Sequence, residues 1–505
     1  MVAPSTSYRP RALLQILKEG FLPLFFCGTL LSGSAASAQH VDFNARMEKA
    51  LQDIVHLRYG ALHQKLRQER KKHPQNRAAD YLEAASICIA LFVNERVEGF
   101  TQEEPRLETL LERLETVPEK DPYQKLLRGE IMLGTAILQG KYGHTWAAAW
   151  RFSKAYKLLK TNYERFPEFA PNYLPWGVLM TAIGSLPESY QVIAGLLGFA
   201  GDVDSGLALI RQGYYQCQNT ARWRFYKGYH GFVYAFVYQQ LEIKPAPTLP
   251  QLGLPVASSS FFIYLHAQEL LDQGKATKAY ILLQKRPQGE GLLPFPFLHY
   301  LTGKVALSVA PEKAGPHFHR FLRESENDIY RNSSQRFLAW YHLLRREKDS
   351  VAYWRERLLQ APPGASGADE QARREARLGW NPTLVRARLA YDGGRYHEAL
   401  HLLKNDPPAH LANWARLEWH YRQGRAYQAL HAYQKAQKHY QRGLRYPPTE
   451  NSYALGNSTL QLGNLALKAQ DTSTARQWYQ RCLNYTDYPF YEGIHQKAKA
   501  RLSGL

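Results

Sequence analysis

Two histidines and a glutamate in the second half of the chain have the spacing of a zinc site. His397 and His401 are four residues apart with Glu398 beside the first, which fits the pattern H-E-x-x-H. On a helix this spacing puts both imidazoles on one face, where they can hold zinc while the glutamate acts as general base. A third ligand would have to come from a neighbouring helix, with Glu418 as the candidate. A zinc-dependent peptidase is therefore an alternative function to be weighed.

Other pairs of titratable residues have poorer spacing for chemistry. His317 and His319 are two apart, so on a helix their side chains point about 200° away from one another. Asp202 and Asp204 are also two apart, and we expect them to cap or flank a helix amino terminus rather than act as paired carboxylates. No phosphate-binding loop, nucleophile elbow or dinucleotide fingerprint occurs. We therefore expect no enzyme activity, no cofactor and no metal.

The residues around His397 also fit a structural repeat. Segments that begin near Tyr421 and Leu460 carry matching residues 39 positions apart, namely Gly424 with Gly463, Ala436 with Ala475, Tyr440 with Tyr479, and Gly443 with Cys482. A second spacing places one residue five positions before an alanine, in Gly274 with Ala279, Gly394 with Ala399, His431 with Ala436, and Gln470 with Ala475. Small residues let two helices approach closely, and aromatic side chains fill the holes between them. The repeat accounts for the sequence after His397 without zinc.

This register resembles the tetratricopeptide repeat, most clearly over about 257–485. The resemblance implies an all-α fold, an α-solenoid of stacked antiparallel helical hairpins in a tetratricopeptide-like superhelix. Apolar residues at three- and four-residue steps extend the helical prediction upstream, including one long helix over 42–72, and strand signals are almost absent. We expect a divergent helical-repeat region over 39–215, a helix and linker over 216–256, and the repeat array over 257–505.

The first 38 residues have the pattern of a secretory signal peptide. Arg9, Arg11 and Lys18 give a basic start, 21–31 is a short apolar core, and Ala38 ends a small-residue cleavage site. The apolar core is shorter than the roughly 20 residues of a membrane span, although an uncleaved anchor stays open. The sequence thus predicts export, to a periplasm or out of the cell.

The remaining chain is strongly basic. The net charge is +20, and the signal segment contributes three basic residues less Glu19, so about +18 remains. This charge favours anionic partners, including an anionic lipid or glycan of the envelope, but no nucleic-acid-binding motif accompanies it. Cys88, Cys217 and Cys482 are widely separated, and we expect them to be buried small side chains rather than a disulfide framework.

The middle of the chain carries a narrower resemblance. The run over 155–173, then 184–187, 198–202 and 206–207, is similar to the family of tetratricopeptide repeat protein 39 and the yeast mitochondrial outer-membrane inclusion-clearance protein, together with uncharacterised bacterial relatives. That resemblance implies an all-helical scaffold without catalytic residues. We interpret Gly198, Gly201, Asp202 and Gly206 as a structural junction between the divergent and the repeat halves, with a positive φ at Gly201 and Asp202 as a helix cap.

The preferred function is a non-catalytic scaffold that binds a protein or peptide on the concave face of the stack. Aromatic and basic side chains left exposed on the first helix of each hairpin would make the contacts. We take Tyr421, Arg425 and Tyr427 as the candidate partner-binding residues, with core packing as a second explanation for Tyr427.

Overall fold

Helices make up the regular structure of this protein. The computed structural model describes residues 39–94, 97–186, 191, 194–196, 198–243, 245–326, 328–364, 366–450, 452–502 and 504–505. Within these ranges the extended pairing amounts to one isolated bridge, between His40 and Asn76. The predicted all-α class is confirmed, and the expected signal segment over 1–38 lies outside the described residues.

The chain forms two compact units. The amino-terminal unit holds the described residues up to His266 together with Lys285–Phe295, and the carboxy-terminal unit holds Ala267–Gln284 and Pro296–Leu505. The expected linker over 216–256 is part of the first unit, because Tyr234, Leu249 and Leu254 share one core cluster with Phe262. This division differs from the predicted boundaries at 215 and 257.

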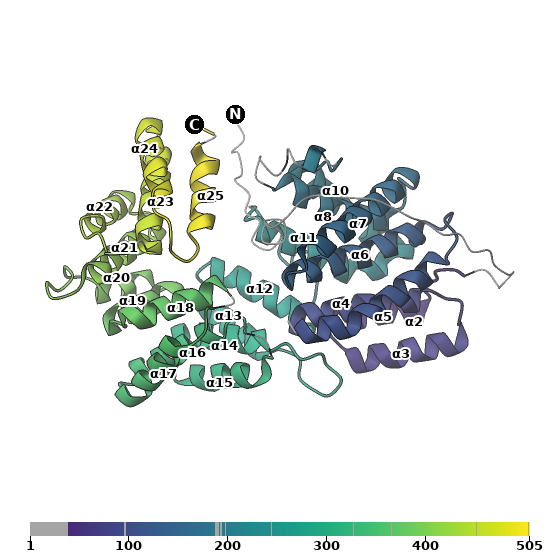
Figure 1. Cartoon of the computed structure of the whole chain (residues 1–505), viewed down its shortest axis with the longest axis horizontal. Helices are drawn as coiled ribbons and strands as arrows, with labels where there is room; N and C mark the ends of the chain where they lie inside the picture. Colours follow the sequence, from purple (N-terminus) through teal and green to yellow (C-terminus); the bar gives the residue numbers. More distant parts are fainter. Residues whose placement is uncertain are drawn as a thin grey trace. The chain divides into compact units, whose positions relative to one another are not determined.

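Each unit is a series of helices that pair with their neighbours along the chain (Figure 1). The amino-terminal unit contains α2 (Ala45–Val55), α3 (Tyr59–Lys72), α4 (Ala78–Asn94), α5 (Val97–Glu115), α6 (Pro122–Lys141), α7 (Thr145–Arg165), α8 (Tyr173–Gly184), α10 (Val203–Asn219) and α11 (Lys227–Gln240), and α12 (Ser260–Asp272) crosses the division. The carboxy-terminal unit continues with α13 (Ala276–Gln284), α14 (Phe297–Val309), α15 (Ala314–Glu324), α16 (Arg331–Leu344), α17 (Lys348–Gln360), α18 (Gly367–Leu378), α19 (Pro382–Asp392), α20 (Tyr396–Leu402), α21 (Asn413–Ala429), α22 (Tyr433–Gly443), α23 (Tyr453–Lys468), α24 (Thr472–Leu483) and α25 (Tyr491–Leu502).

One turn conformation closes many of these hairpins. In these hairpins the residue five positions before the buried alanine has a positive φ. These residues are Gly274 (69°), Gly394 (78°), His431 (60°) and Gln470 (63°). The next residue donates its backbone N–H to the carbonyl five positions back, at 2.8 Å from Arg395 to Ala390 and 2.9 Å from Ala432 to Tyr427. This is the Schellman arrangement, which satisfies the last carbonyls of the first helix. The predicted five-residue spacing is the spacing between this turn and the packing alanine.

The same turn occurs in the divergent amino-terminal unit. Gly143 has φ 85° and stands five residues before the buried Ala148, and Leu57 has φ 57° and stands five before the buried Leu62. The prediction of one helix over 42–72 is wrong, because the chain reverses at Leu57 without a glycine. Asp53 holds this turn, since it accepts from Arg58 at 2.8 Å and from Lys65 at 2.6 Å, on the two sides of the reversal.

Small residues opposite aromatic rings fill the hairpins as predicted. A Cβ placed on Gly424 would lie 2.6 Å from Cε1 of Tyr440, and one on Gly463 would lie 2.5 Å from Cε1 of Tyr479. Both tyrosines are fully buried. The ring of the second helix therefore occupies the space that a side chain on the first helix would need, which fixes the stacking of α21 on α22 and of α23 on α24.

The glycine-rich segment before α10 differs in part from its prediction. Asp202 caps α10 as expected, accepting from the Ser205 N–H at 2.8 Å. The positive φ belongs to Gly198 (79°), however, and the prediction for Gly201 is wrong. Gly201 is instead required by close packing, because a Cβ there would lie 2.7 Å from the backbone nitrogen of Gly184.

Gly206 continues this close contact one turn further along α10. Its Cβ would lie 2.6 Å from the Thr181 nitrogen and 2.7 Å from the Gly177 oxygen of α8. Since α8 and α10 both belong to the amino-terminal unit, this segment is a tight helix crossing inside that unit. The interpretation of it as the junction between the two halves is wrong.

A carboxyl group lies between two tyrosines in the amino-terminal unit. Tyr81 donates to Glu130 at 2.8 Å and Tyr229 at 3.4 Å. Burial raises the pKa of Glu130 from its ordinary value of 4.5 to about 7, against the opposing effect of the tyrosine hydrogen bonds. The folded protein therefore holds this proton at pH values where the unfolded chain releases it.

We expect the free energy of unfolding to fall as pH rises from about 4.5 to about 7, because the folded state binds more protons in that window. The loss is at most about 3 kcal/mol. Glu130→Gln, which is neutral throughout, should flatten this dependence in urea titrations at pH 5 and pH 8. An unchanged pH slope in the variant would contradict the assignment.

The turn at Gly394 offers a direct test of the hairpin geometry. Its added Cβ would overlap the carbonyl of Gly274, whereas Gly143 has the same sign of φ and nothing within 4 Å of its added Cβ. We expect Gly143→Ala to cost about 1 kcal/mol for the left-handed conformation alone, and Gly394→Ala about 3 kcal/mol, since overlap adds to it. Urea denaturation followed by circular dichroism measures both, and equal losses would argue against the backbone contact.

Candidate partner-binding surface

The three predicted contact residues lie on α21, but they face different surroundings. Tyr421 is 2% exposed and packs in a core cluster with Tyr440, so the expectation that it is an exposed contact residue is wrong. Arg425 is partly buried and donates to Tyr421 Oη at 3.0 Å. The ring of Tyr427 stacks on His439 of α22 at 5.1 Å between centroids and packs against the same core cluster. The structure thus brings Tyr421 and Arg425 together and leaves Tyr427 in hairpin packing.

Polar side chains connect the first helices of successive hairpins. Arg425 of α21 donates to Tyr391 Oη of α19 at 2.7 Å. Arg422 donates to Tyr453 Oη of α23 at 2.5 Å. Glu418 accepts from both side chains, at 2.6 Å from Arg422 and at 2.5 Å from Tyr453. We call this set the arginine strip, with members Arg336, Glu375, Arg388, Tyr391, Glu418, Tyr421, Arg422, Arg425 and Tyr453.

The strip extends toward α16 through a shared carboxylate. Arg336 of α16 and Arg388 of α19 contact the same Glu375 oxygen on α18, at 3.3 and 3.1 Å. Both guanidinium groups also lie against Trp340, at 5.2 and 4.9 Å from its ring centroid. Burial opposes ionisation of Glu375, but the two arginines outweigh it and lower the pKa of this carboxyl. Glu375 is therefore an anion that binds two helices to α18.

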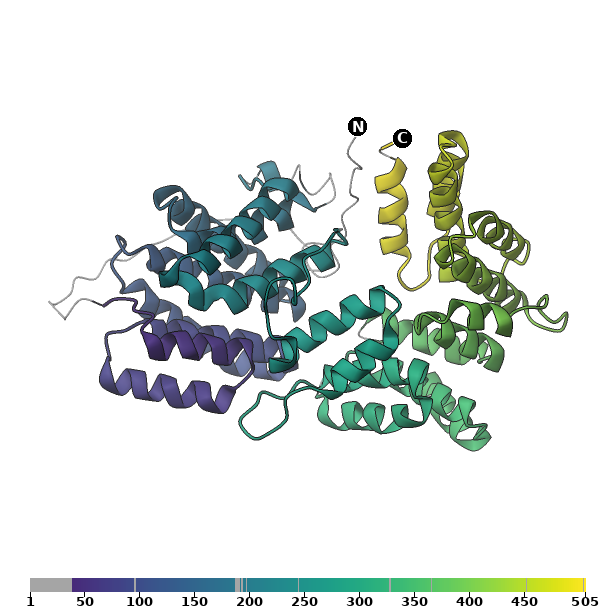
Figure 2. The same ribbon diagram turned by 180° about the vertical axis from the view of Figure 1, so that it is seen from behind.

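The helices that carry the strip form one layer of the hairpin stack. Figure 1 and Figure 2 show α19 to α24 following one another as neighbouring helices of the carboxy-terminal unit. The first helices contact one another across hairpins, α19 with α21 and α21 with α23. A ligand that lies along this layer would meet side chains from several repeats at once.

Arg425 differs from the other strip arginines in its partners. Arg336, Arg388 and Arg422 each contact a glutamate. In the described part of the chain Arg425 has two tyrosine hydroxyls and two tyrosine rings as partners, and no carboxylate within ion-pair distance. Tyr421 raises the pKa of Arg425, so the guanidinium is charged at every accessible pH. A held, uncompensated cation thus stands in the first-helix layer.

The zinc pattern does not form a metal cluster among the described residues. His397 and Glu398 are exposed on the seven-residue α20, and Glu398 accepts from Arg395 Nε at 2.5 Å. Glu418 is tied to Arg422 and Tyr453 in the strip. No group of three His, Cys, Asp or Glu side chains in the described ranges is arranged to hold a metal ion.

The remaining titratable candidates have structural partners. His317 lies 3.5 Å from His299 between their Nδ1 atoms, and the His319 ring packs on Trp354 at 5.8 Å. Cys88, Cys217 and Cys482 are buried free thiols, as expected from their spacing.

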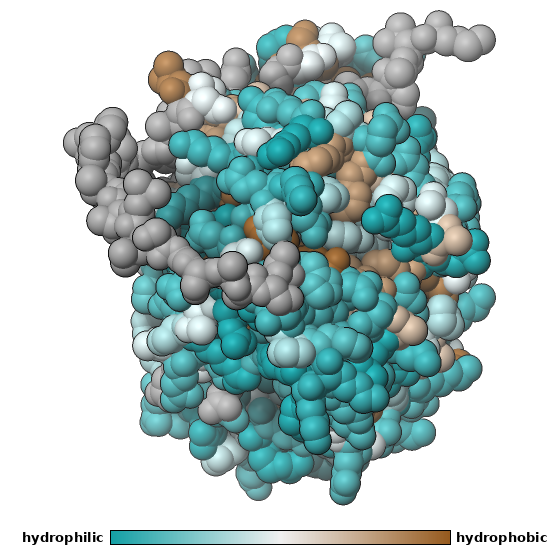
Figure 3. Space-filling view, turned by 90° about the vertical axis from the view of Figure 1, so that its right-hand side faces the viewer, coloured by the Kyte–Doolittle hydropathy of each residue, from teal (hydrophilic) through white to brown (hydrophobic). Residues whose placement is uncertain are grey.

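No helix within the described residues is long and apolar enough to cross a membrane. The face of the molecule drawn in Figure 3 is mainly hydrophilic, with apolar side chains gathered in limited areas.

Sequence reasoning missed most of the strip. Arg388, Tyr391 and Tyr453 carry no motif of their own, and the 39-residue register does not match them with the strip residues of α21. The signal that was available is the 34-residue separation of Tyr391 and Arg425, which is the usual length of the repeat and links equivalent helices of neighbouring hairpins.

The loss of stability on removing one partner of an ion pair tests whether ion pairs stabilise the arginine strip. Glu418 and Arg422 have side chains only 14% and 7% exposed, so Arg422→Ala leaves a poorly solvated carboxylate and should cost about 3 kcal/mol. The double variant Glu418→Gln with Arg422→Met should lose less than the sum of its single variants in urea denaturation. The exposed pair Arg395 and Glu398 is the control, with an expected loss below about 1 kcal/mol. Additive losses at Glu418 and Arg422 would contradict their coupling.

Comparison with known proteins gives no family assignment. No protein-family model matches the chain, and no curated protein matches it. Similar solved structures include a human IFIT1 dimer with PPP-AAAA, at 12% identity over 91% of this chain and 92% of that chain, with a TM-score of 0.23. Another is the APC/C hetero-tetramer Cut9-Hcn1, at 13% identity over 90% and 95%, with a TM-score of 0.20.

TM-scores this low carry no argument about shared function or overall fold. The narrower resemblance to the tetratricopeptide repeat protein 39 family finds no support in these comparisons. The assignment of stacked tetratricopeptide-like hairpins rests on the turn, the small-residue contacts and the helix pairing described above.

Proposed function

We propose that the protein is a non-catalytic helical-repeat scaffold that binds a protein or peptide partner on the first-helix layer of its carboxy-terminal unit. The observation that carries this proposal is Arg425, a partly buried guanidinium with no carboxylate among its described partners. A partly desolvated cation gains more from a carboxylate than an exposed one, because the surroundings screen the interaction less. The partner therefore presents an acidic side chain or a terminal carboxylate to Arg425.

The surroundings of Arg425 favour specific binding of a ligand carboxylate over non-specific electrostatic attraction. Two hydroxyls fix the guanidinium, so little side-chain entropy is lost when a ligand binds. Tyr391 is only partly buried and adds an aromatic surface beside the charge. The polar row continues along the layer, since Gln428 donates to Gln461 of α23 at 2.8 Å. An extended acidic segment fits a row of this kind better than a compact ligand does.

The test compares Arg425→Gln with Arg386→Gln. Arg386 is an exposed arginine of α19, the same layer, and within the described ranges it has no hydrogen bond or ion pair. On arrays of peptides with internal Asp and Glu or a free carboxyl terminus, we expect Arg425→Gln to weaken binding tenfold or more, which is the cost of truncating one partner of a buried charge pair. Arg386→Gln should bind nearly as the parent does. Equal binding by the parent and Arg425→Gln would contradict the proposal.

We also propose that the chain works outside the cytoplasm, on the strength of the signal pattern in its first 38 residues. Recovery of the unprocessed protein from the cytoplasm of its host would contradict this.

A further inference from the structure

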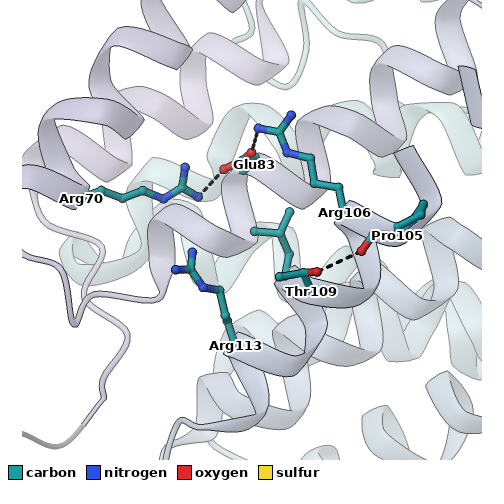
Figure 4. A pocket seen from close by; sticks show the side chains of 7 residues that line it. Arg70, Glu83, Pro105, Arg106, Thr109 and Arg113 are labelled. Carbon is teal, nitrogen blue, oxygen red and sulfur yellow. Dashed lines mark hydrogen bonds and ion pairs between the residues drawn. The ribbon is translucent and has the colours of Figure 1, made fainter. Parts of the chain in front are cut away.

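A cavity in the amino-terminal unit is lined by arginines from two helices. It has a volume of about 430 Å³ and lies among α3, α4 and α5. Arg70 reaches it from α3 and Glu83 from α4, while Arg106, Thr109, Leu110 and Arg113 line it from α5 (Figure 4). None of these residues belongs to the arginine strip.

Two buried carboxylates form the base of the cluster. Asp80 is 2% exposed and accepts from Arg70 at 2.9 Å, Arg77 at 3.1 Å and Arg113 at 3.2 Å. Glu83 is 5% exposed and pairs with both Arg70 and Arg106. Four guanidinium groups thus share two carboxylates. Glu103 lies 3.9 Å from Arg106, and with it three carboxylates stand against four guanidinium groups, which leaves a positive balance.

Two of the four arginines are not required to neutralise the two buried carboxylates. Arg70 and Arg77 alone would give both buried acids a cationic partner. Arg106 and Arg113 have side chains 56% and 49% exposed, and each uses one of its five N–H donors on a carboxylate within hydrogen-bonding distance. They are seven residues apart on α5 and lie on one stripe with Thr109 and Leu110, so their remaining donors border the same hollow.

We propose that this cavity binds a small organic anion through a tetrahedral oxyanion, a phosphate or sulfate ester. Guanidinium groups reach the cavity from both α3 and α5, so the ligand must accept hydrogen bonds from several directions. A tetrahedral oxyanion does this, whereas a planar carboxylate accepts mainly within its own plane. The site is open to solvent, and its volume exceeds that of a bare phosphate, which leaves room for an organic substituent. The exposed ring of Pro105 gives the organic part of the ligand an apolar wall.

Calorimetric titration of the full chain tests the site with inorganic phosphate, sulfate and phenyl phosphate at constant ionic strength. We expect phenyl phosphate to bind more tightly than inorganic phosphate, and Arg106→Gln with Arg113→Gln to weaken both at least tenfold. Arg165→Gln is the matched control, because this arginine is 46% exposed and lies 3.9 Å from Glu119, away from the cavity. It should leave the affinity unchanged.

A second variant changes the site in the opposite direction. Glu83→Gln removes one negative charge and keeps an acceptor oxygen, so it should tighten phosphate binding severalfold. If the double arginine variant fails to fold, Arg106→Gln alone carries the test, since Asp80 then keeps all three of its arginines.

No binding of any of the three anions, or equal binding by the arginine variants and the parent, would overturn the proposal. Binding to vesicles of anionic phospholipid without binding of the free esters would overturn it too, because a small-molecule site does not require a membrane surface.

Discussion

The hairpin turn with one residue in the left-handed conformation is the constraint on which the rest of this structure depends. It ends the first helix, satisfies the last carbonyls and sets the direction of the second helix. A small or apolar buried side chain five residues later then decides how closely the two helices pack. The turn recurs at Leu57 and Gly143 in one unit and at Gly394, His431 and Gln470 in the other, so the two units share a construction rule although their sequences differ.

Because of this rule, the residues that determine the fold differ from those available to bind a partner. Once the turn and the aromatic rings of the second helix fix each hairpin, the positions of the first helix that face neighbouring hairpins are free to carry charge. Arg422 and Arg425 occupy such positions on α21, where the neighbouring hairpins supply Tyr453 and Tyr391 as partners. A side chain held from the next repeat is ordered before a ligand arrives, and the stack can therefore present several ordered cations in a row.

The parts of the fold that follow local rules could be predicted from the sequence. The spacing of Gly394 and Ala399 and the matching of Gly424 with Tyr440 are local, because they concern one hairpin. Leu57 escaped prediction because a leucine at positive φ has no compositional signal and depends on the ion pairs of Asp53. Gly201 was assigned the wrong role for a related reason, since a glycine needed for close approach to α8 looks the same in sequence as one needed for its φ.

The candidate sites were harder to predict because their partners come from other hairpins. The sequence of α21 alone predicts an exposed Tyr421, but the ring of Tyr440 and the next hairpin cover it. The pairing of Arg425 with Tyr391 depends on the rotation of α21 against α19, which no single repeat encodes. Element type and register are therefore recoverable from one sequence, whereas the choice of neighbours across the stack is not.

The large positive charge acts at two ranges in this protein. Spread over many helices, it attracts anionic molecules over distances up to about a Debye length, roughly 8 Å at physiological salt, without selecting among them. Selection needs cations that are fixed and partly desolvated. Arg425 is fixed by neutral hydroxyls, so a ligand carboxylate competes with no carboxylate among the described partners of Arg425. Arg106 and Arg113 are instead anchored by buried acids that already take part of their charge. An anion must bring more charge to the second site to bind as well, which favours a phosphate or sulfate group there and a carboxylate at Arg425.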